Sequence, residues 1–378
     1  WTGIYFNGNP VTITAIAEPG YMFDYWEPNL AYPTNNYNMT IVQNFTQNDI
    51  AKAHFKLAPS IAVTEINFKS DPTRNSSDWI EFYNYGSTPI TMSNWKIQVS
   101  STGQTYTIPS GTTLNANSYL VFVQDTNIFR SQYGYVPNKR GHTYLNFNDN
   151  TDEIYLMNNF NNIVYRVYYS DTGKWPECAS GLGRTLQIKN HLSNPNVSSS
   201  WTCGCMGGSP GTGVLPCSES IIFSEINYNP RNDTINPDDW VELLNKGTAP
   251  VDISGWVFKD GLDEHSFTIP DGTILNPNQR LVLSSDLLNF NLTYDNFNIT
   301  NVVGEVPFKL DGNKEAIRLY NKQGKLYYSM VYHDNYPWPV EADGNGYTLE
   351  LLQPDANPNE GTSWFAGCFL GSPGSAYV

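Results

Sequence analysis

Residues 78–86 have the sequence DWIEFYNYG, and residues 239–247 have the sequence DWVELLNKG. Successive side chains of a strand take opposite faces, so Trp79 and Glu81 share one face of the first segment while Asp78, Ile80 and Phe82 share the other. A pattern this specific, met again 161 residues later, predicts two copies of one domain.

The match extends outward on both sides of these strands. An apolar strand ending in Glu-Ile-Asn precedes each, an Ile-Pro-x-Gly-Thr turn follows each, and both copies close with Gly-Ser-Pro-Gly. Copies of about 150 residues are tandem domains, since solenoid repeats are far shorter. The repeat predicts an N-terminal module over 1–57, a first domain over 58–213 and a second over 214–378.

Short runs rich in Val, Ile, Tyr, Phe and Thr, with turn signals every eight to twelve residues, predict an all-β sandwich for each copy. No segment of ten or more residues keeps an apolar period of 3.6, so we expect little helix. The first 57 residues match neither copy and predict a small, separate β module.

The composition limits the classes of function. Only 15% of the 378 residues are charged, 14% are aromatic, and the formal net charge is −15. This acidity opposes nucleic-acid binding, which needs clustered Lys and Arg. No apolar stretch approaches the roughly 20 residues of a membrane span. Low charge and abundant aromatics favour a secreted or surface protein.

The two copies resemble lamin tail domains of the bacterial extracellular kind, on the Glu-Ile-Asn strand ends, the Asp-Trp-(Ile/Val)-Glu strands and the tryptophans Trp95 and Trp256. The run VTITA at 11–15, with EPGYMFDYW at 18–26, is similar to the internalin-type B-repeat. The resemblance implies immunoglobulin-like sandwiches without shared catalytic residues. It also implies the C-terminal part of a large Bacteroidota surface protein, exported by the type IX route and sometimes carrying a CotH kinase-like domain upstream.

Acidic residues gather at the facing ends of the first two strands of each copy, with Asp71 in one intervening loop and Asp233 and Asp238 in the other. Carboxylate oxygens brought together are what Ca²⁺ requires. A glutamate near a loop can instead accept backbone N–H bonds, and alternation along the strand opposes convergence. Both interpretations remain open for the six acids: Glu65, Asp78, Glu81, Glu225, Asp239 and Glu242.

Aromatic residues beside prolines suggest a stacking platform for sugar rings. They are Trp175 in the first copy, and Tyr336 and Trp338 in the second. Because the Trp-Pro pair occurs in both copies, packing within the fold is the preferred interpretation. Only the second copy looks adapted to display its aromatics.

Five cysteines, none in paired CxxC motifs, suit disulfides in an oxidising compartment better than a zinc site. Cys217 lies just before the first strand of the second copy and Cys368 near the end of that copy, so we expect this pair to close the domain. Cys178 has a choice between Cys203 and Cys205. An odd number leaves one thiol unpaired or bonded outside this chain.

Two motifs suggest catalysis. Residues 207–211 match G-x-S-x-G, but Pro210 lacks the N–H that an oxyanion needs, so we expect a domain-closing turn. His265 lies near Asp260, Asp263 and Glu264, a set that suggests a metal or acid–base cluster, and a solvated loop between two strands is the preferred interpretation.

We therefore expect a non-enzymatic structural and protein-interaction region, extracellular or on the outer-membrane surface. Its expected partners are other domains of the same protein or cell-surface proteins. Ca²⁺, as in the hypothesis above, is the one cofactor that the sequence suggests. The alternative is a carbohydrate-binding accessory module of a secreted enzyme or adhesin.

Overall fold

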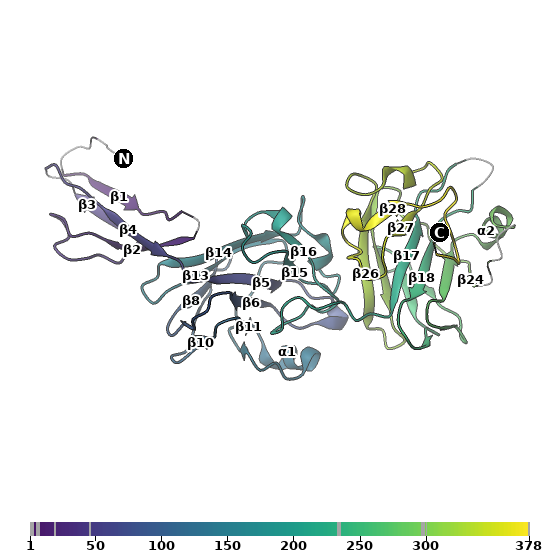
Figure 1. Cartoon of the computed structure of the whole chain (residues 1–378), viewed down its shortest axis with the longest axis horizontal. Helices are drawn as coiled ribbons and strands as arrows, with labels where there is room; N and C mark the ends of the chain where they lie inside the picture. The colour runs from purple at the N-terminus through teal and green to yellow at the C-terminus, as the bar shows by residue number, and fades with distance from the viewer. Residues whose placement is uncertain are drawn as a thin grey trace.

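The computed structural model describes residues 4, 8–18, 20–44, 47–232, 236–295, 299 and 301–376. Three β modules follow one another along the long axis of the molecule (Figure 1). The described residues contain two short α-helices, some 3-10 turns and many short strands, which confirms the all-β prediction.

The N-terminal module consists of two antiparallel strand pairs, β1 with β3 and β2 with β4. Phe23, Trp26, Ile41 and Ala15 form its small core. The strands are β1 (Pro10–Thr14), β2 (Tyr21–Trp26), β3 (Thr40–Asn44) and β4 (Ala53–Leu57).

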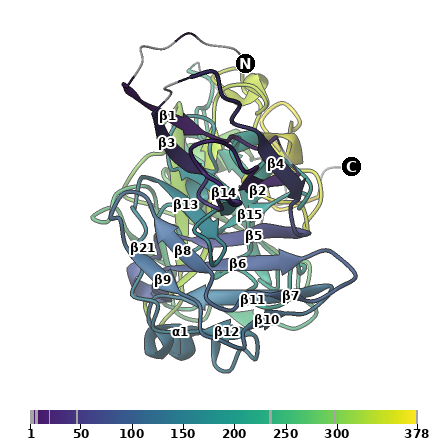
Figure 2. The same ribbon diagram turned by 90° about the vertical axis from the view of Figure 1, so that its left-hand side faces the viewer.

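The first sandwich packs a six-stranded sheet, in the order β12-β11-β6-β5-β15-β16, against a four-stranded sheet, in the order β14-β13-β8-β9. Figure 2 shows β5, β6 and β11 side by side. The elements are β5 (Ile61–Asn67), η1 (Pro72–Arg74), β6 (Trp79–Asn84), β7 (Ile90–Thr91), β8 (Lys96–Val99), β9 (Thr105–Thr107), β10 (Thr113–Leu114), β11 (Ser118–Val123), α1 (Thr126–Tyr133), β12 (Lys139–Arg140), β13 (Thr151–Met157), β14 (Ile163–Ser170), η2 (Glu177–Ala179), β15 (Leu186–Ile188), η3 (Ser198–Ser200) and β16 (Trp201–Cys203).

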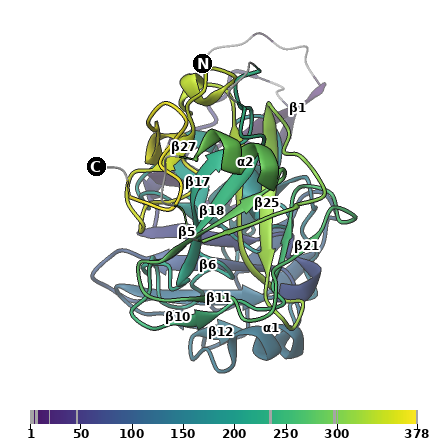
Figure 3. The same cartoon turned by 90° about the vertical axis from the view of Figure 1, so that its right-hand side faces the viewer.

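The second sandwich repeats this topology, with sheets in the orders β24-β23-β18-β17-β27-β28 and β21-β20-β25-β26. Its helix α2 lies at the end far from the first sandwich (Figure 3). The elements are β17 (Ile221–Asn227), β18 (Trp240–Asn245), β19 (Val251–Asp252), β20 (Val257–Lys259), β21 (Phe267–Thr268), β22 (Ile274–Leu275), β23 (Arg280–Ser284), α2 (Leu287–Thr293), β24 (Val302–Val303), β25 (Lys314–Tyr320), β26 (Leu326–His333), η4 (Val340–Ala342), β27 (Leu349–Leu351), η5 (Gly361–Ser363) and β28 (Trp364–Ala366).

The alternation in the Asp-Trp strands has a specific outcome, because both faces of β6 are covered. Ile80 and Phe82 point into the core between the two sheets. Trp79 points the other way and packs with Phe129 of α1, at 6.1 Å between ring centroids. Glu81 shares that outer face and is also buried. The groups that cover this glutamate form part of the first candidate site.

Candidate functional site

Each sandwich buries a glutamate beneath the turn that closes it. In the first copy, both carboxylate oxygens of Glu65 accept the backbone N–H of Ser209, at 3.0 and 3.1 Å, and the Thr185 hydroxyl donates to Glu65 at 2.5 Å. In the second, Glu225 accepts the N–H of Ser372 at 2.9 Å. A carboxylate thus holds each Gly-Ser-Pro-Gly turn onto the sheet.

A second glutamate on the neighbouring strand binds the end of the same turn. Glu81 lies opposite Glu65 across the strand pair and accepts the N–H of Gly211 at 2.6 Å. Glu242 accepts the N–H of Gly374 at 2.8 Å. We call these four glutamates, with turns 208–211 and 371–374, the carboxylate clasps.

The clasp carboxyls hold protons more tightly than ordinary glutamates do. Burial raises the pKa of Glu65 to about 8, with a further contribution from the charge of Glu81, and burial raises the pKa of Glu81 to about 7. In the second copy, burial and then the charge of Glu242 raise the pKa of Glu225 well above its ordinary value. Burial also raises the pKa of Glu242 to about 7.

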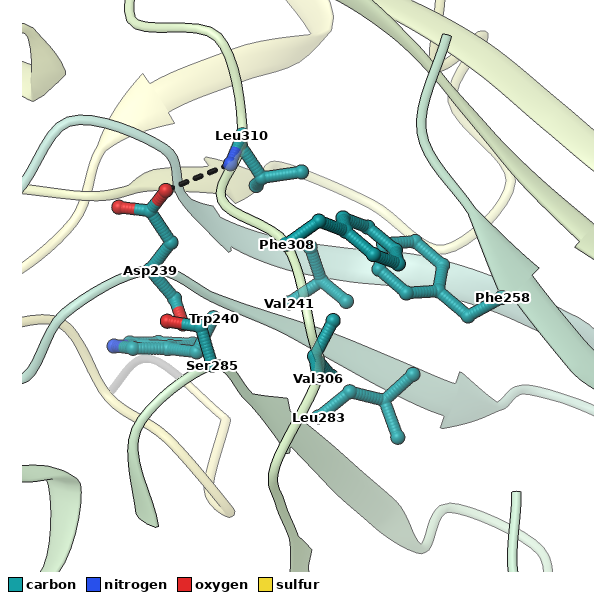
Figure 4. Close-up of a pocket in the computed structure, with 9 residues that line it drawn as sticks. All are labelled: Asp239, Trp240, Val241, Phe258, Leu283, Ser285, Val306, Phe308 and Leu310. Atoms are coloured by element: carbon teal, nitrogen blue, oxygen red, sulfur yellow. Dashed lines mark hydrogen bonds between the residues drawn. The ribbon is translucent and has the colours of Figure 1, made fainter. Parts of the chain in front are cut away.

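Asp78 and Asp239 bind segments other than the closing turns. Asp78 accepts the N–H of Phe147 at 2.8 Å, and Asp239 accepts that of Leu310 at 2.7 Å (Figure 4). Burial raises the pKa of each aspartate to about 7. The cavity beside Asp239 has a volume of about 10 Å³, so it can hold one water molecule but no larger ligand.

The geometry gives the calcium hypothesis no support. The clasp glutamates and the two aspartates already accept backbone hydrogen bonds, as the second interpretation of the acids expects. Within the described ranges, no group of three or more His, Cys, Asp or Glu side chains is placed to hold a metal ion. Asp71 caps η1 by accepting the N–H of Thr73, and Asp233 lies outside the described residues.

The catalytic motifs have structural partners. The Ser209 hydroxyl lies 3.2 Å from Glu65 and 3.2 Å from the Gln187 amide, and no histidine of the described residues makes a hydrogen bond to it. His265 pairs with the buried Asp260 at 2.5 Å, and this hydrogen bond raises the pKa of the histidine. Residues 208–211 form the closing turn that the sequence predicts.

The predicted pairing of Cys217 with Cys368 is wrong. Cys217 bonds to Cys205, twelve residues before it, and Cys368 is free and exposed. The expectation assumed that the two ends of a sandwich meet, whereas the segment that enters the second sandwich is bonded back to the first. Cys178 bonds to Cys203 and ties η2 to β16.

The aromatic residues considered for sugar binding are not displayed together. Trp338 is only 5% exposed, and its ring stacks on Trp364 at 6.0 Å, so it belongs to the core and not to a platform. Trp175 is half-buried and packs against the first core. Of these three side chains, only that of Tyr336 is exposed, at 88%.

A second candidate site, the junction between the sandwiches, covers the outer edge of β26. An uncovered edge strand presents unpaired backbone groups to other chains. Here the Leu326 N–H donates to the Thr73 hydroxyl at 2.8 Å, and its carbonyl accepts from Arg74. Further along, the Ser329 carbonyl accepts from the guanidinium of Arg184 at 3.0 Å. The first sandwich therefore binds part of the backbone edge of the second, and Asn359 of the second sandwich accepts the N–H of Val331 at 3.0 Å further along.

Apolar contacts reinforce this junction. Met206 of the first sandwich is 8% exposed and belongs to the hydrophobic core of the second. Arg184 is 1% exposed and lies over the Tyr328 ring, 5.1 Å from its centroid. At the rim, Lys314 pairs with Glu177 at 2.9 Å. These contacts bury side chains of the first sandwich against the second, although each sandwich keeps its own core.

The N-terminal module meets the first sandwich beside the corresponding edge strand, β14. Met22 of β2 packs into the first core, and the Tyr37 ring stacks on Phe160 at 5.2 Å. Each sandwich thus receives the preceding module along the same strand of its four-stranded sheet.

Sequence reasoning missed the junction residues because it relied on positions that match between copies. Arg184 and Met206 occupy positions where the second copy has Tyr347 and Phe369. A mismatch at a conserved place in the repeat was the available signal, since a surface that binds a different neighbour needs different side chains.

A groove of about 490 Å³ lies beside Glu242, Arg280 and Glu350 in the second sandwich. One of its lining residues, Ala376, directly precedes residues 377–378, which lie outside the described ranges. We assign it no ligand.

A family model for the lamin tail domain matches residues 57–171 and 217–334. Both matches stop before the closing strands, so β15–β16, β27–β28 and the clasp turns lie beyond the matched parts. A search among curated proteins found no match. In the described part of the chain, no helix has the length and apolar character needed to cross a membrane.

Proposed function

Because the chain belongs to the lamin tail domain family, with two tandem copies, we propose that it is a non-catalytic structural and protein-interaction region of a larger extracellular or cell-surface protein. The covered edge of β26 carries this proposal. A spacer must keep its modules in one orientation, and a junction that satisfies the backbone of a neighbouring strand does so.

Two observations support a location outside the cytoplasm. The bonds Cys178–Cys203 and Cys205–Cys217 suit an oxidising compartment. The small N-terminal module, with its antiparallel pairs β1–β3 and β2–β4, is compatible with the internalin-like module that the sequence resembles. A Bacteroidota surface protein exported by the type IX route is the setting that we propose.

The proposal is tested on cells that produce the protein. An antibody to the second sandwich should bind intact cells, or protein in the medium, as well as it binds permeabilised cells. Alkylation before lysis should leave Cys178 and Cys205 unmodified. Binding only after permeabilisation, with both cysteines alkylated, would contradict an extracellular location.

The glycan-binding alternative now depends on Tyr336, the exposed member of its aromatic set. It predicts retardation of the protein in gels that contain polysaccharide, and loss of that retardation in Tyr336→Ala. Equal mobility of the two proteins with and without polysaccharide removes this alternative. A Trp338→Ala variant is unsuitable, because that ring is part of the core.

A further inference from the structure

The closing turns of the two sandwiches are equivalent atom for atom in their backbone hydrogen bonds. The Gly207 N–H donates to the Gly183 carbonyl at 2.6 Å, and the Leu370 N–H donates to the Gly346 carbonyl at 2.7 Å. This register makes Tyr347 the counterpart of Arg184, Cys368 the counterpart of Cys205, and Phe369 the counterpart of Met206.

In the first sandwich, the residues at all three positions contact the second sandwich or the segment that leads into it. Arg184 binds the backbone of β26, Met206 enters the second core, and Cys205 is bonded to Cys217 in the segment that leads into the second sandwich. The Leu182 carbonyl beside them accepts the Ser329 hydroxyl at 2.6 Å.

In the second sandwich, the same three positions face outward. Phe369 is 47% exposed, its ring makes an edge contact with the half-buried Tyr347 at 6.0 Å, and Cys368 is exposed with a free thiol. We call Tyr347, Cys368 and Phe369 the distal face. Aromatic side chains here replace the charged Arg184 and the flexible Met206.

We propose that the distal face is the docking surface for a further β module, which lays an uncovered edge strand on Tyr347 and Phe369 and carries a cysteine opposite Cys368. Continuity with the observed junction supports this occupant, because the first sandwich uses equivalent positions to bind β26 and Cys217. Two aromatic rings select an edge strand with apolar side chains at the contact. The inference rests on the proposed spacer function and names the class of its next partner.

The test uses the full chain extended by its own second sandwich. Residues 212–378 are joined after Gly374, which places the second Cys217 twelve residues beyond Cys368, as Cys217 is beyond Cys205. The added sandwich has a hydrophobic core of its own, to which the first sandwich contributes Met206. With glutathione disulfide as oxidant, the two cysteine thiols become one disulfide, and glutathione disulfide is reduced to two glutathione thiols that take up the two protons.

Peptide mass mapping should show a bond between the original Cys368 and the added Cys217. The added sandwich should also melt at a higher temperature than in the same chain with Phe369→Asp in the original second sandwich. If the original Cys368 still reacts with iodoacetamide, and Phe369→Asp does not change the melting temperature, the inference is overturned. If Cys205–Cys217 still forms in that chain, the proposed spacer function survives the failure.

The unextended chain provides a second test. If Phe369 serves a partner and not the fold, Phe369→Asp in residues 1–378 should lower the melting temperature by less than about 2 °C, as surface substitutions do. A loss of 10 °C or more would assign Phe369 to the fold and overturn the docking surface.

Discussion

At the scale of single residues, the unusual feature is a pair of buried carboxyls side by side on the outer face of the six-stranded sheet in each sandwich. Glu65 and Glu81 are cross-strand partners, and both are buried. Two like charges placed opposite each other without water destabilise the fold, so one or both carboxyls keep a proton. The fold is therefore most stable where these carboxyls are neutral, because the cost of burying their charge exceeds what the hydrogen bonds to the charged form return.

This chemistry predicts an inverted pH dependence of stability. Because the folded pKa values of Glu65 and Glu81, about 8 and about 7, exceed the ordinary value of 4.5, the folded chain binds more protons than the unfolded chain between these limits. The free energy of unfolding then decreases as pH rises from about 4.5 to about 8. We expect thermal melting several degrees higher at pH 5.5 than at pH 8.5.

The matched variants are Glu65→Gln, which mimics the neutral carboxyl, and Glu264→Gln at an exposed position. The first should reduce the slope of the pH profile without abolishing it, because the other buried acids still titrate. The second should leave the profile unchanged. A wild-type melting temperature that increases steadily from pH 5.5 to pH 8.5 would disprove the assignment.

Calcium should not affect stability through these acids. Ca²⁺ needs six to eight oxygen ligands, whereas the clasp oxygens are already bound to backbone N–H groups. We expect the melting temperature of chelator-treated protein to stay within about 1 °C when millimolar Ca²⁺ is added, compared with Mg²⁺ as control. An increase specific to Ca²⁺ would restore the calcium hypothesis.

At the scale of elements, β26 is the strand whose environment decides how the molecule is assembled. It pairs with β25 on one side, and among the described residues no further strand pairs with it on the other. Thr73, Arg74 and Arg184 supply hydrogen-bond partners for its first part. Side chains from another domain thus take the place of a neighbouring strand, which protects the edge from aggregation.

The Arg184→Ala variant removes the bonds to Ser329 and to the Gly204 carbonyl, together with the contact to Tyr328. Because a buried hydrogen bond to a charged group contributes about 1.5–3 kcal/mol, we expect a loss of that order. Hydrogen exchange of the peptide 326–333 should accelerate by about tenfold or more.

Lys314→Ala serves as the control, since its ion pair with Glu177 is half-exposed and worth at most about 1 kcal/mol. Unchanged exchange in Arg184→Ala would mean that the sheet holds β26 without help from the first sandwich.

At the scale of the whole molecule, the modules form a row in which each sandwich receives its predecessor along β14 or β26. Such a row transmits orientation from one end to the other as long as the junctions stay closed. Burial of Met206 in the neighbouring core is the contact least compatible with opening.

The Met206→Asp variant should open the junction between the sandwiches, because it places a carboxylate in an apolar core. Small-angle X-ray scattering should show a broader distribution of interatomic distances and a larger radius of gyration, with the Cys205–Cys217 bond intact. Phe369→Asp, the same change at the equivalent exposed position, should leave the scattering curve unchanged. Identical curves for Met206→Asp and wild type would show that the junction does not depend on this contact.

Local patterns were sufficient to predict two all-β copies, because strand alternation, turn residues and a repeat are properties of neighbouring positions. The same patterns predicted that residues 208–211 close the domain. Neither depends on which distant segments come together.

Only the tertiary structure decided what the acids and cysteines do. Glu65 meets Ser209 across 144 positions of sequence, and Arg184 meets Ser329 across 145. Cys217 bonds backward to Cys205 because its segment runs along the first sandwich before entering the second. Burial, pairing and pKa depend on distances in space, and these are set by how whole sheets pack, not by the order of residues along a strand.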